Sequence, residues 1–146
     1  MKTRWFAATA AVAAITCIGA AAFAQTPAKP LKEQVVGHWR LVSASVDNQT
    51  PYGGDPVGTL FLDAAGHYAI IIITAGAARN VAYFGAYTTD DADGSVTSHI
   101  EASNNQAANG RDEKRYVVFD ADKMIVTSRK PSGPSGGIKL TWQRDN

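Results

Sequence analysis

Most of the chain from residue 36 onward consists of short segments of hydrophobic and β-branched residues, separated by clusters of Gly, Pro, Asn, Asp and Ser. No long stretch has the spacing of an amphipathic helix, so the pattern is typical of an all-β sandwich or barrel. We predict eight strands: Val36–Val46, Gly58–Asp63, His67–Thr74, Val81–Asp90, Ser95–Ser103, Glu113–Phe119, Met124–Arg129 and Ile138–Arg144.

The turns between these segments favour one topology. An Asp-Ala-x-Gly sequence, or a near copy of it, starts at Asp63, Asp91 and Asp120. An aspartate side chain holds a tight turn and a glycine accepts positive φ, so each sequence predicts a hairpin. Successive hairpins indicate an antiparallel up-and-down barrel. An eight-stranded closed sheet has no free edge, and its interior can hold one small ligand.

Three other segments complete the predicted barrel. Leu31 to Val36 can form one helical turn that covers one end, and the turn-forming stretch from Asp47 to Pro56 is long enough to arch over the other. The run from Ile70 to Ile73 lacks polar alternation, which predicts a strand buried on both faces. The alternative is an aggregation-prone strand with no further meaning.

The first 24 residues are typical of a secretory signal peptide. Lys2 and Arg4 precede an uncharged apolar run, and Ala22-Phe23-Ala24 is a small-x-small cleavage site. The alternative is a membrane anchor. We therefore expect a signal peptide at 1–24, a proline-containing linker at 25–30 and a β-barrel domain at 31–146, in a periplasmic or secreted protein without an integral membrane span.

Cleavage changes the chemistry that the mature chain can carry. It removes Cys17, the only cysteine, and with it any disulfide or thiol nucleophile. The formal net charge of +1 becomes −1 when Lys2 and Arg4 are lost. No basic cluster remains, so neither nucleic-acid binding nor electrostatic membrane docking is indicated. We expect a monomer.

Two short motifs resemble those of lipocalins. Gly37-His38-Trp39, at the start of the first predicted strand, is similar to the lipocalin Gly-x-Trp signature, and Arg144 stands at the end of the last strand. The resemblance implies that the arginine packs across Trp39 in a cation–π contact that seals the barrel base. Gly37, Trp39 and Arg144 are thus expected to be structural.

A longer resemblance is to the bacterial lipocalin-like domain. It is carried by the runs Val36–Ala44, Tyr83–Tyr87 and Gly94–Glu101, and it covers most of residues 31–146. It implies a ligand-sized cavity but names no ligand, because fold alone does not give function. The loops 104–112 and 130–137 depart from the family pattern.

His99 and Glu101 are the first candidates for the cavity wall. They stand two residues apart and so share one strand face, while Val96, Ser98 and Ile100 occupy the other. The more apolar face is ordinarily the inner one, whereas the resemblance favours His99 and Glu101 inside. Inside the barrel they would orient a ligand or act as an acid–base couple. The alternative is a polar pair that fixes the strand register.

Tyr83, Tyr87 and Arg115 are the remaining candidates. The two tyrosines share a face with Gly85, which leaves room for a ligand or for a bulky neighbour across the sheet. Arg115 and Tyr116 take opposite faces. An inward Arg115 would pair with Glu101, whereas an outward one is an ordinary solvated charge.

Other kinds of site are not indicated. The turn at Asp91 resembles a calcium loop, but the acidic residues required at its first and twelfth positions are missing. The three histidines lie on separate strands without metal-ligand spacing. No phosphate loop, dinucleotide fingerprint or nucleophile elbow occurs, and we expect neither a metal nor a cofactor.

The prediction is therefore an exported lipocalin-like barrel that binds a small, mostly apolar ligand, with Tyr83, Tyr87, His99 and Glu101 on the cavity wall. Two alternatives stay open. One is a barrel isomerase or cyclase that uses His99 and Glu101 as acid and base. The other is a barrel packed shut that acts through a protein partner on its outer surface.

Overall fold

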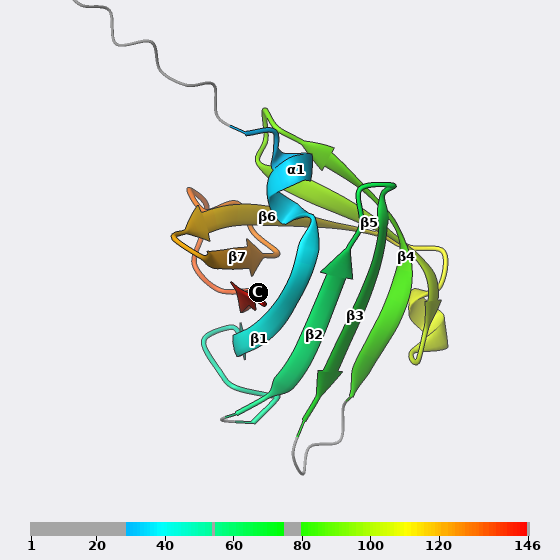
Figure 1. Cartoon of the computed structure of the whole chain (residues 1–146). Helices are drawn as coiled ribbons and strands as arrows, with labels where there is room; N and C mark the ends of the chain where they lie inside the picture. Colours follow the sequence, from blue (N-terminus) through cyan, green and yellow to red (C-terminus); the bar gives the residue numbers. More distant parts are fainter. Residues whose placement is uncertain (1–28, 54, 75–79, 146) are drawn as a thin grey trace, which may run out of the picture.

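The computed structural model describes residues 29–53, 55–74 and 80–145, which form one closed antiparallel barrel (Figure 1). The eight predicted strands are present, and the predicted fold class is confirmed. The strands are β1 Gly37–Val46, β2 Val57–Leu62, β3 His67–Ile73, β4 Val81–Asp90, β5 Ser95–Ser103, β6 Asp112–Asp120, β7 Lys123–Thr127 and β8 Ile138–Arg144.

The strand order is up-and-down, as the hairpin turns predict. Each strand pairs with the next in sequence, and β8 returns to pair with β1 from Trp39↔Arg144 to Val46↔Ile138. Closure leaves no edge strand for another chain to extend. The 3₁₀-helix η1, Gln106–Ala108, lies in the connection between β5 and β6.

The short helix α1, Leu31–Val35, covers one end of the barrel, which we call the closed end (Figure 1). Leu31 and Val35 are buried, as predicted for a covering turn. The Leu31 amide donates to Asp91 Oδ1 over 2.9 Å, which ties the start of α1 to the β4–β5 turn. The opposite end, where β1, β3, β5 and β7 finish, is the open end.

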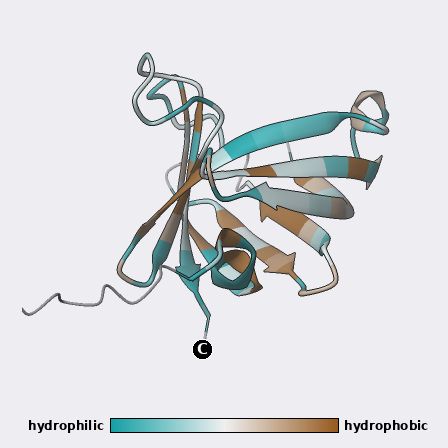
Figure 2. Cartoon of the chain, turned by 90° about the horizontal axis from the view of Figure 1, so that it is seen from above, coloured by the Kyte–Doolittle hydropathy of each residue, from teal (hydrophilic) through white to brown (hydrophobic). Residues whose placement is uncertain are grey.

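Along most of each strand, alternate side chains point into the barrel. Hydrophobic colour is concentrated on the strands in Figure 2, and the buried core includes Leu60, Leu62, Ile70 and Ile72. The prediction that the isoleucine run is buried on both faces is wrong. Ile71 is 43% exposed, because β3 has an inner face and an uncovered outer one.

Two of the predicted turns illustrate how the hairpins are held. Asp63 Oδ1 accepts the amides of Gly66 and His67, each over 2.8 Å, and Gly66 takes φ +99°. Between β6 and β7 the positive φ falls on Ala121, at +53°, instead of on a glycine. At these two places, the aspartate that starts the turn is therefore a better predictor of the hairpin than a glycine at its end.

The predicted signal peptide and residues 25–28 of the predicted linker lie outside the described residues. Within the described ranges, no helix has the length and hydrophobicity needed to cross a membrane.

Candidate functional site

The closed end is sealed around Trp39 and Arg144. The Arg144 guanidinium lies 4.1 Å from the centre of the Trp39 ring, the cation–π contact that the lipocalin resemblance implies. It also donates to the carbonyls of Val36, over 2.8 Å, and Gln34, over 2.6 Å. A Cβ on Gly37 would stand 2.6 Å from Arg144 Nη1, so only glycine leaves room for this arginine. These three residues hold α1 on the barrel.

A cavity lies above this seal. Its volume is about 60 Å³, several times the roughly 10–15 Å³ that one water molecule needs. Apolar side chains from seven elements make most of its wall: Val35, Leu60, Leu62, Ile70, Val96, Val117, Met124, Val126 and Leu140. Its polar wall groups belong to Tyr68, Tyr83, Ser98, Glu113, Arg115 and Trp142.

A wider hollow of about 530 Å³ lies at the open end. We call it the mouth. It shares three wall residues with the cavity, Tyr83, Glu113 and Arg115, and we call these three residues the waist. The mouth is otherwise more polar, with Asn80, Asn104 and Asn105 on its wall, and Tyr52 lies there too.

Glu113 and Arg115 form an ion pair at the waist. Arg115 Nη2 donates to Glu113 Oε2 over 2.5 Å, and the Arg115 and Glu113 side chains are only 20% and 33% exposed, respectively. They stand two residues apart on β6 and so share its inner face. The structure thus places Arg115 inward, but its partner is Glu113 and not Glu101 as predicted. The pair places two opposite charges on the cavity wall, so together they add no net charge to the cavity.

The phenols of Tyr68 and Tyr83 meet inside the barrel, edge to face, with ring centres 5.9 Å apart. Burial raises the pKa of Tyr83 to about 12, and the nearby Glu113 carboxylate acts in the same direction. Burial also raises the pKa of Tyr68, again with help from Tyr83 and Glu113. Both phenols therefore keep their protons at neutral pH and can donate a hydrogen bond.

Two residues that line the cavity each carry a buried polar side-chain atom that has no hydrogen-bond partner among the described residues. These atoms are Tyr68 Oη and Trp142 Nε1, and the Tyr68 and Trp142 residues are 6% and 0% exposed. Ser98 lies close enough to Tyr68 to lower its pKa slightly, but the two do not complete a hydrogen bond of ordinary geometry. A buried polar atom without a partner costs about 1–3 kcal/mol.

His99 and Glu101 do not line the cavity, contrary to the prediction. Both are exposed, while Val96 and Ile100 are buried on the opposite face of β5. The burial of Val96 and Ile100 therefore determines which face of β5 points inward, as is usual for a strand with one buried face. His99 Nδ1 lies 2.7 Å from Asp112 Oδ1 on the outer surface.

A bulge in β5 explains the position of Glu101. Phe84 pairs with Ala102 and Gly85 pairs with Ile100, so Glu101 is the extra residue. A Cβ on Gly85 would stand 2.0 Å from the His99 carbonyl oxygen, so glycine is required opposite the bulge. Beyond it the alternation is reversed, and Ser103 reaches the wall of the mouth.

Of the two predicted tyrosines, Tyr83 lies on the cavity wall and Tyr87 does not. Tyr87 is buried nearer the closed end, where its hydroxyl donates to the Asp63 carbonyl over 2.6 Å. Its amide also donates to the Gly66 carbonyl. Tyr87 therefore holds the β2–β3 turn and has no free polar group to offer a ligand.

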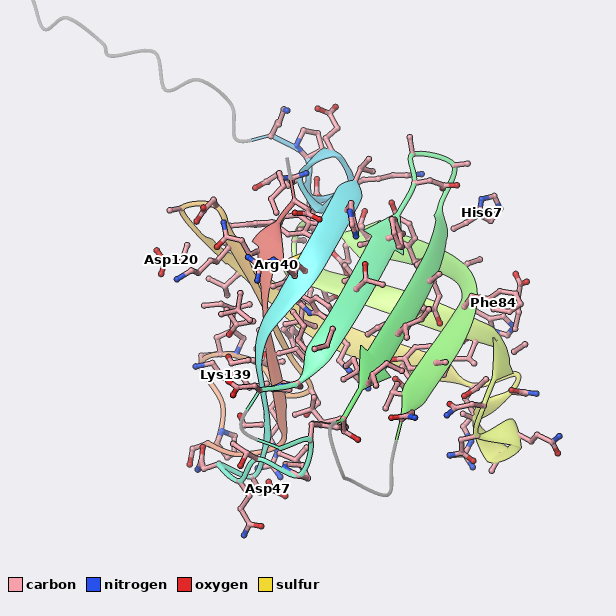
Figure 3. All side chains as sticks on the ribbon, turned by 60° about the horizontal axis from the view of Figure 1, so that its bottom comes forward. Arg40, Asp47, His67, Phe84, Asp120 and Lys139 are labelled. Carbon is pink, nitrogen blue, oxygen red and sulfur yellow. The ribbon has the colours of Figure 1, made fainter. Side chains whose placement is uncertain are left out.

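The histidines lie on the outer surface, each beside an aspartate: His38 with Asp145, His67 with Asp63 and His99 with Asp112. Figure 3 shows His67 and Phe84 pointing away from the barrel. Within the part of the chain that the structure describes, no three His, Cys, Asp or Glu side chains come together as a metal site.

Sequence reasoning missed four polar residues of the cavity wall: Tyr68, Ser98, Glu113 and Trp142. A signal was available for Glu113, because it shares a strand face with Arg115 and with the buried Val117. The sequence has no signal for Trp142 beyond its place in the last predicted strand, and the isoleucine run after Tyr68 lacks the polar alternation that would assign the face of Tyr68. The missing partner of each buried atom is a property of the packed structure.

The comparisons with known proteins agree with this geometry. A family model described as a lipocalin-like domain matches residues 72–145. The matched range runs from the end of β3 through β8 and includes Tyr83, Glu113, Arg115 and Trp142. No curated protein matches the chain.

Proposed function

Because the chain belongs to the family of lipocalin-like domains, we propose that its barrel binds one small, mostly apolar molecule. Such barrels are typical of small-molecule binding, since a closed eight-stranded sheet encloses about one ligand's volume.

One observation carries the proposal, namely the mostly apolar cavity inside the barrel, which shares its waist residues with a wider mouth. Ligand sites are concave and mostly apolar, with a few polar groups that set orientation. The wall described above has that composition, and Tyr83, Glu113 and Arg115 supply polar groups at the waist. The ligand enters from the open end, since Trp39, Arg144 and α1 close the other.

The proposal includes export, because the sequence of residues 1–24 is typical of a secretory signal peptide. The mature protein would act as a periplasmic or secreted monomer. Without cysteine it would depend on burial and hydrogen bonds for stability.

Neither alternative function gains support from the geometry. An acid–base couple of His99 and Glu101 lies on the outer surface and cannot reach a molecule inside the barrel. A barrel packed shut is less well supported than an open one, because the described side chains leave a space of about 60 Å³ inside the barrel.

Native mass spectrometry of the mature protein, purified from the periplasm of an exporting host, tests the binding proposal. We expect an adduct of small-molecule mass that reappears between preparations and is lost on organic extraction. Incubating the extracted protein with a lipid and metabolite extract should restore the adduct. A bare protein mass in both experiments would contradict the proposed function.

A further inference from the structure

We propose that the ligand is an uncharged molecule that presents a hydrogen-bond acceptor, such as a carbonyl oxygen, to the indole N–H of Trp142. This inference rests on the proposed binding function and adds the chemical class of the ligand. It is carried by the indole N–H of a residue that lines the cavity, because this donor has no acceptor in the part of the chain that the structure describes.

The indole nitrogen fixes which kind of group is needed. A tryptophan N–H only donates, so its partner must be an acceptor. The other described tryptophan shows the usual solution, because Trp39 Nε1 donates to the Val35 carbonyl over 2.8 Å. Trp142 is equally buried, lines the cavity and lacks such a partner. The cavity is therefore the place from which an acceptor can come.

Tyr68 adds an independent sign that the cavity wall is incomplete. This residue lines the cavity too, and its hydroxyl is also buried without a partner among the described residues. A hydroxyl both donates and accepts, so it fits either kind of ligand group and does not alter the requirement set by Trp142. Most buried side-chain polar atoms in folded proteins have a partner, so two without one in a single cavity point to a guest with polar atoms.

The charges of the wall indicate an uncharged ligand. Among the described residues that line the cavity, Glu113 and Arg115 are the ionised ones, and they pair with each other. A carboxylate ligand would have to compete with Glu113 for the guanidinium, and an ammonium would have to compete with Arg115. A charge buried without a partner is costly, so a neutral acceptor fits this wall better than either ion.

Three small ring compounds provide matched probes. Cyclohexanone carries one acceptor, methylenecyclohexane has nearly the same shape without it, and cyclohexanecarboxylate carries a charge. The measurement is ¹H–¹⁵N NMR of the mature protein, in which Trp39 and Trp142 supply the indole N–H signals. We expect cyclohexanone to move the Trp142 signal downfield, as a new hydrogen bond does, while the Trp39 signal stays in place.

A ligand–mutant cycle separates the hydrogen bond from differences in hydration between the probes. The quantity compared is the ratio of the dissociation constant of methylenecyclohexane to that of cyclohexanone. We expect Trp142→Phe to lower this ratio about tenfold, the size of one buried hydrogen bond. Tyr87→Phe is the matched control. It removes a hydroxyl that lies off the cavity wall, so the ratio should not change.

Each outcome decides the inference. The inference is supported if cyclohexanone moves the Trp142 signal downfield and the other two probes do not. This result comes from the wild-type protein, so it can be obtained even if Trp142→Phe fails to fold. Binding of both neutral probes without such a shift, or tighter binding of the carboxylate, overturns the inference but leaves the binding function standing. If none of the probes binds at millimolar concentration, the inference fails, and a protein mass without adducts would then show that the binding function fails as well.

Discussion

At the scale of single residues, two buried tyrosines in the same barrel show the difference between a structural and a functional polar group. Tyr87 and Tyr68 are both almost fully buried. The Tyr87 hydroxyl donates to the Asp63 carbonyl over 2.6 Å, whereas the Tyr68 hydroxyl has no partner. The Tyr87 hydroxyl therefore stabilises the fold, whereas the Tyr68 hydroxyl does not.

This difference predicts opposite effects of one substitution. Tyr87→Phe should lower the free energy of unfolding by about 1–2 kcal/mol, since the Asp63 carbonyl loses the nearer of its two donors and keeps only the Gly66 amide, over 3.3 Å. Tyr68→Phe should leave stability unchanged or raise it, because it removes a buried polar atom that is not hydrogen-bonded. Urea unfolding of the extracted, ligand-free protein measures both. A loss of stability in Tyr68→Phe as large as that in Tyr87→Phe would show that Tyr68 has a partner, such as a fixed water.

Asp93 predicts a pH effect at the same scale. Lys114 and Lys130 reach its two carboxylate oxygens, over 2.5 and 2.8 Å, and lower its pKa to about 2. A carboxyl group with a depressed pKa stabilises the fold above its ordinary value of 3.8, and this contribution is lost as pH falls through about 2. The stability difference between wild type and Asp93→Asn should therefore shrink from pH 5 to pH 2, as measured by urea midpoints. The exposed Asp55→Asn is the control for charge removal, and a constant difference for Asp93→Asn would refute the linkage.

At the scale of elements, alternation predicts most strand faces and fails where a strand departs from regular geometry. The run of isoleucines is one such failure, because a continuous hydrophobic run predicts burial on both faces. The barrel instead leaves the outer faces of β2, β3 and β4 uncovered, with Phe61, Ile71 and Phe84 exposed. In β5 a bulge at Glu101 reverses the alternation, and the sequence gives no local sign of it except Gly85 in the neighbouring strand.

Neighbouring isoleucines provide the test of the face assignment. Ile71→Thr keeps a β-branched side chain on an exposed position, so the free energy of unfolding should change by less than about 0.5 kcal/mol. Ile72→Thr places a hydroxyl in the core, where residue 72 is 2% exposed, and should cost about 2 kcal/mol or more. Thermal unfolding followed by circular dichroism compares the two variants. Equal costs would mean that β3 is covered on both sides after all.

Gly85 provides the corresponding test for the bulge. In Gly85→Ala the new methyl group would stand 2.0 Å from the His99 carbonyl oxygen, so the β4–β5 pairing has to shift. We expect a loss of about 3 kcal/mol or more, and faster amide exchange along β5. Gly110→Ala is the control, because Gly110 has positive φ and open space around it. It should cost only about 1 kcal/mol of backbone strain. Equal losses would mean that the close approach at Gly85 is unimportant.

At the scale of the whole molecule, strand number, order and closure could be predicted because they depend on local signals that repeat along the chain. The seal of Trp39 by Arg144 came from the lipocalin resemblance instead, since the two residues lie at opposite ends of the barrel sequence. The cavity wall was predicted only in part. Tyr83 lies on it, but which of two alternating faces of β5 and β6 carries polar groups inward depends on packing across the barrel.

The ion pair at the waist makes the cavity favour uncharged ligands, because the negative charge of Glu113 neutralises the positive charge of Arg115. Glu113→Gln should therefore change the selectivity of the barrel from neutral molecules toward anions. The unpaired guanidinium can then donate to cyclohexanecarboxylate, and a charge-assisted hydrogen bond in a partly exposed site should tighten its binding about tenfold. Isothermal titration of wild type and variant with cyclohexanecarboxylate and cyclohexanone measures the change. Arg115→Met is the opposite control, since it leaves the Glu113 carboxylate alone and should weaken carboxylate binding further. If Glu113→Gln binds the anion no better than wild type does, Arg115 does not face the ligand, and the polarity of the cavity is set by Tyr68 and Trp142 alone.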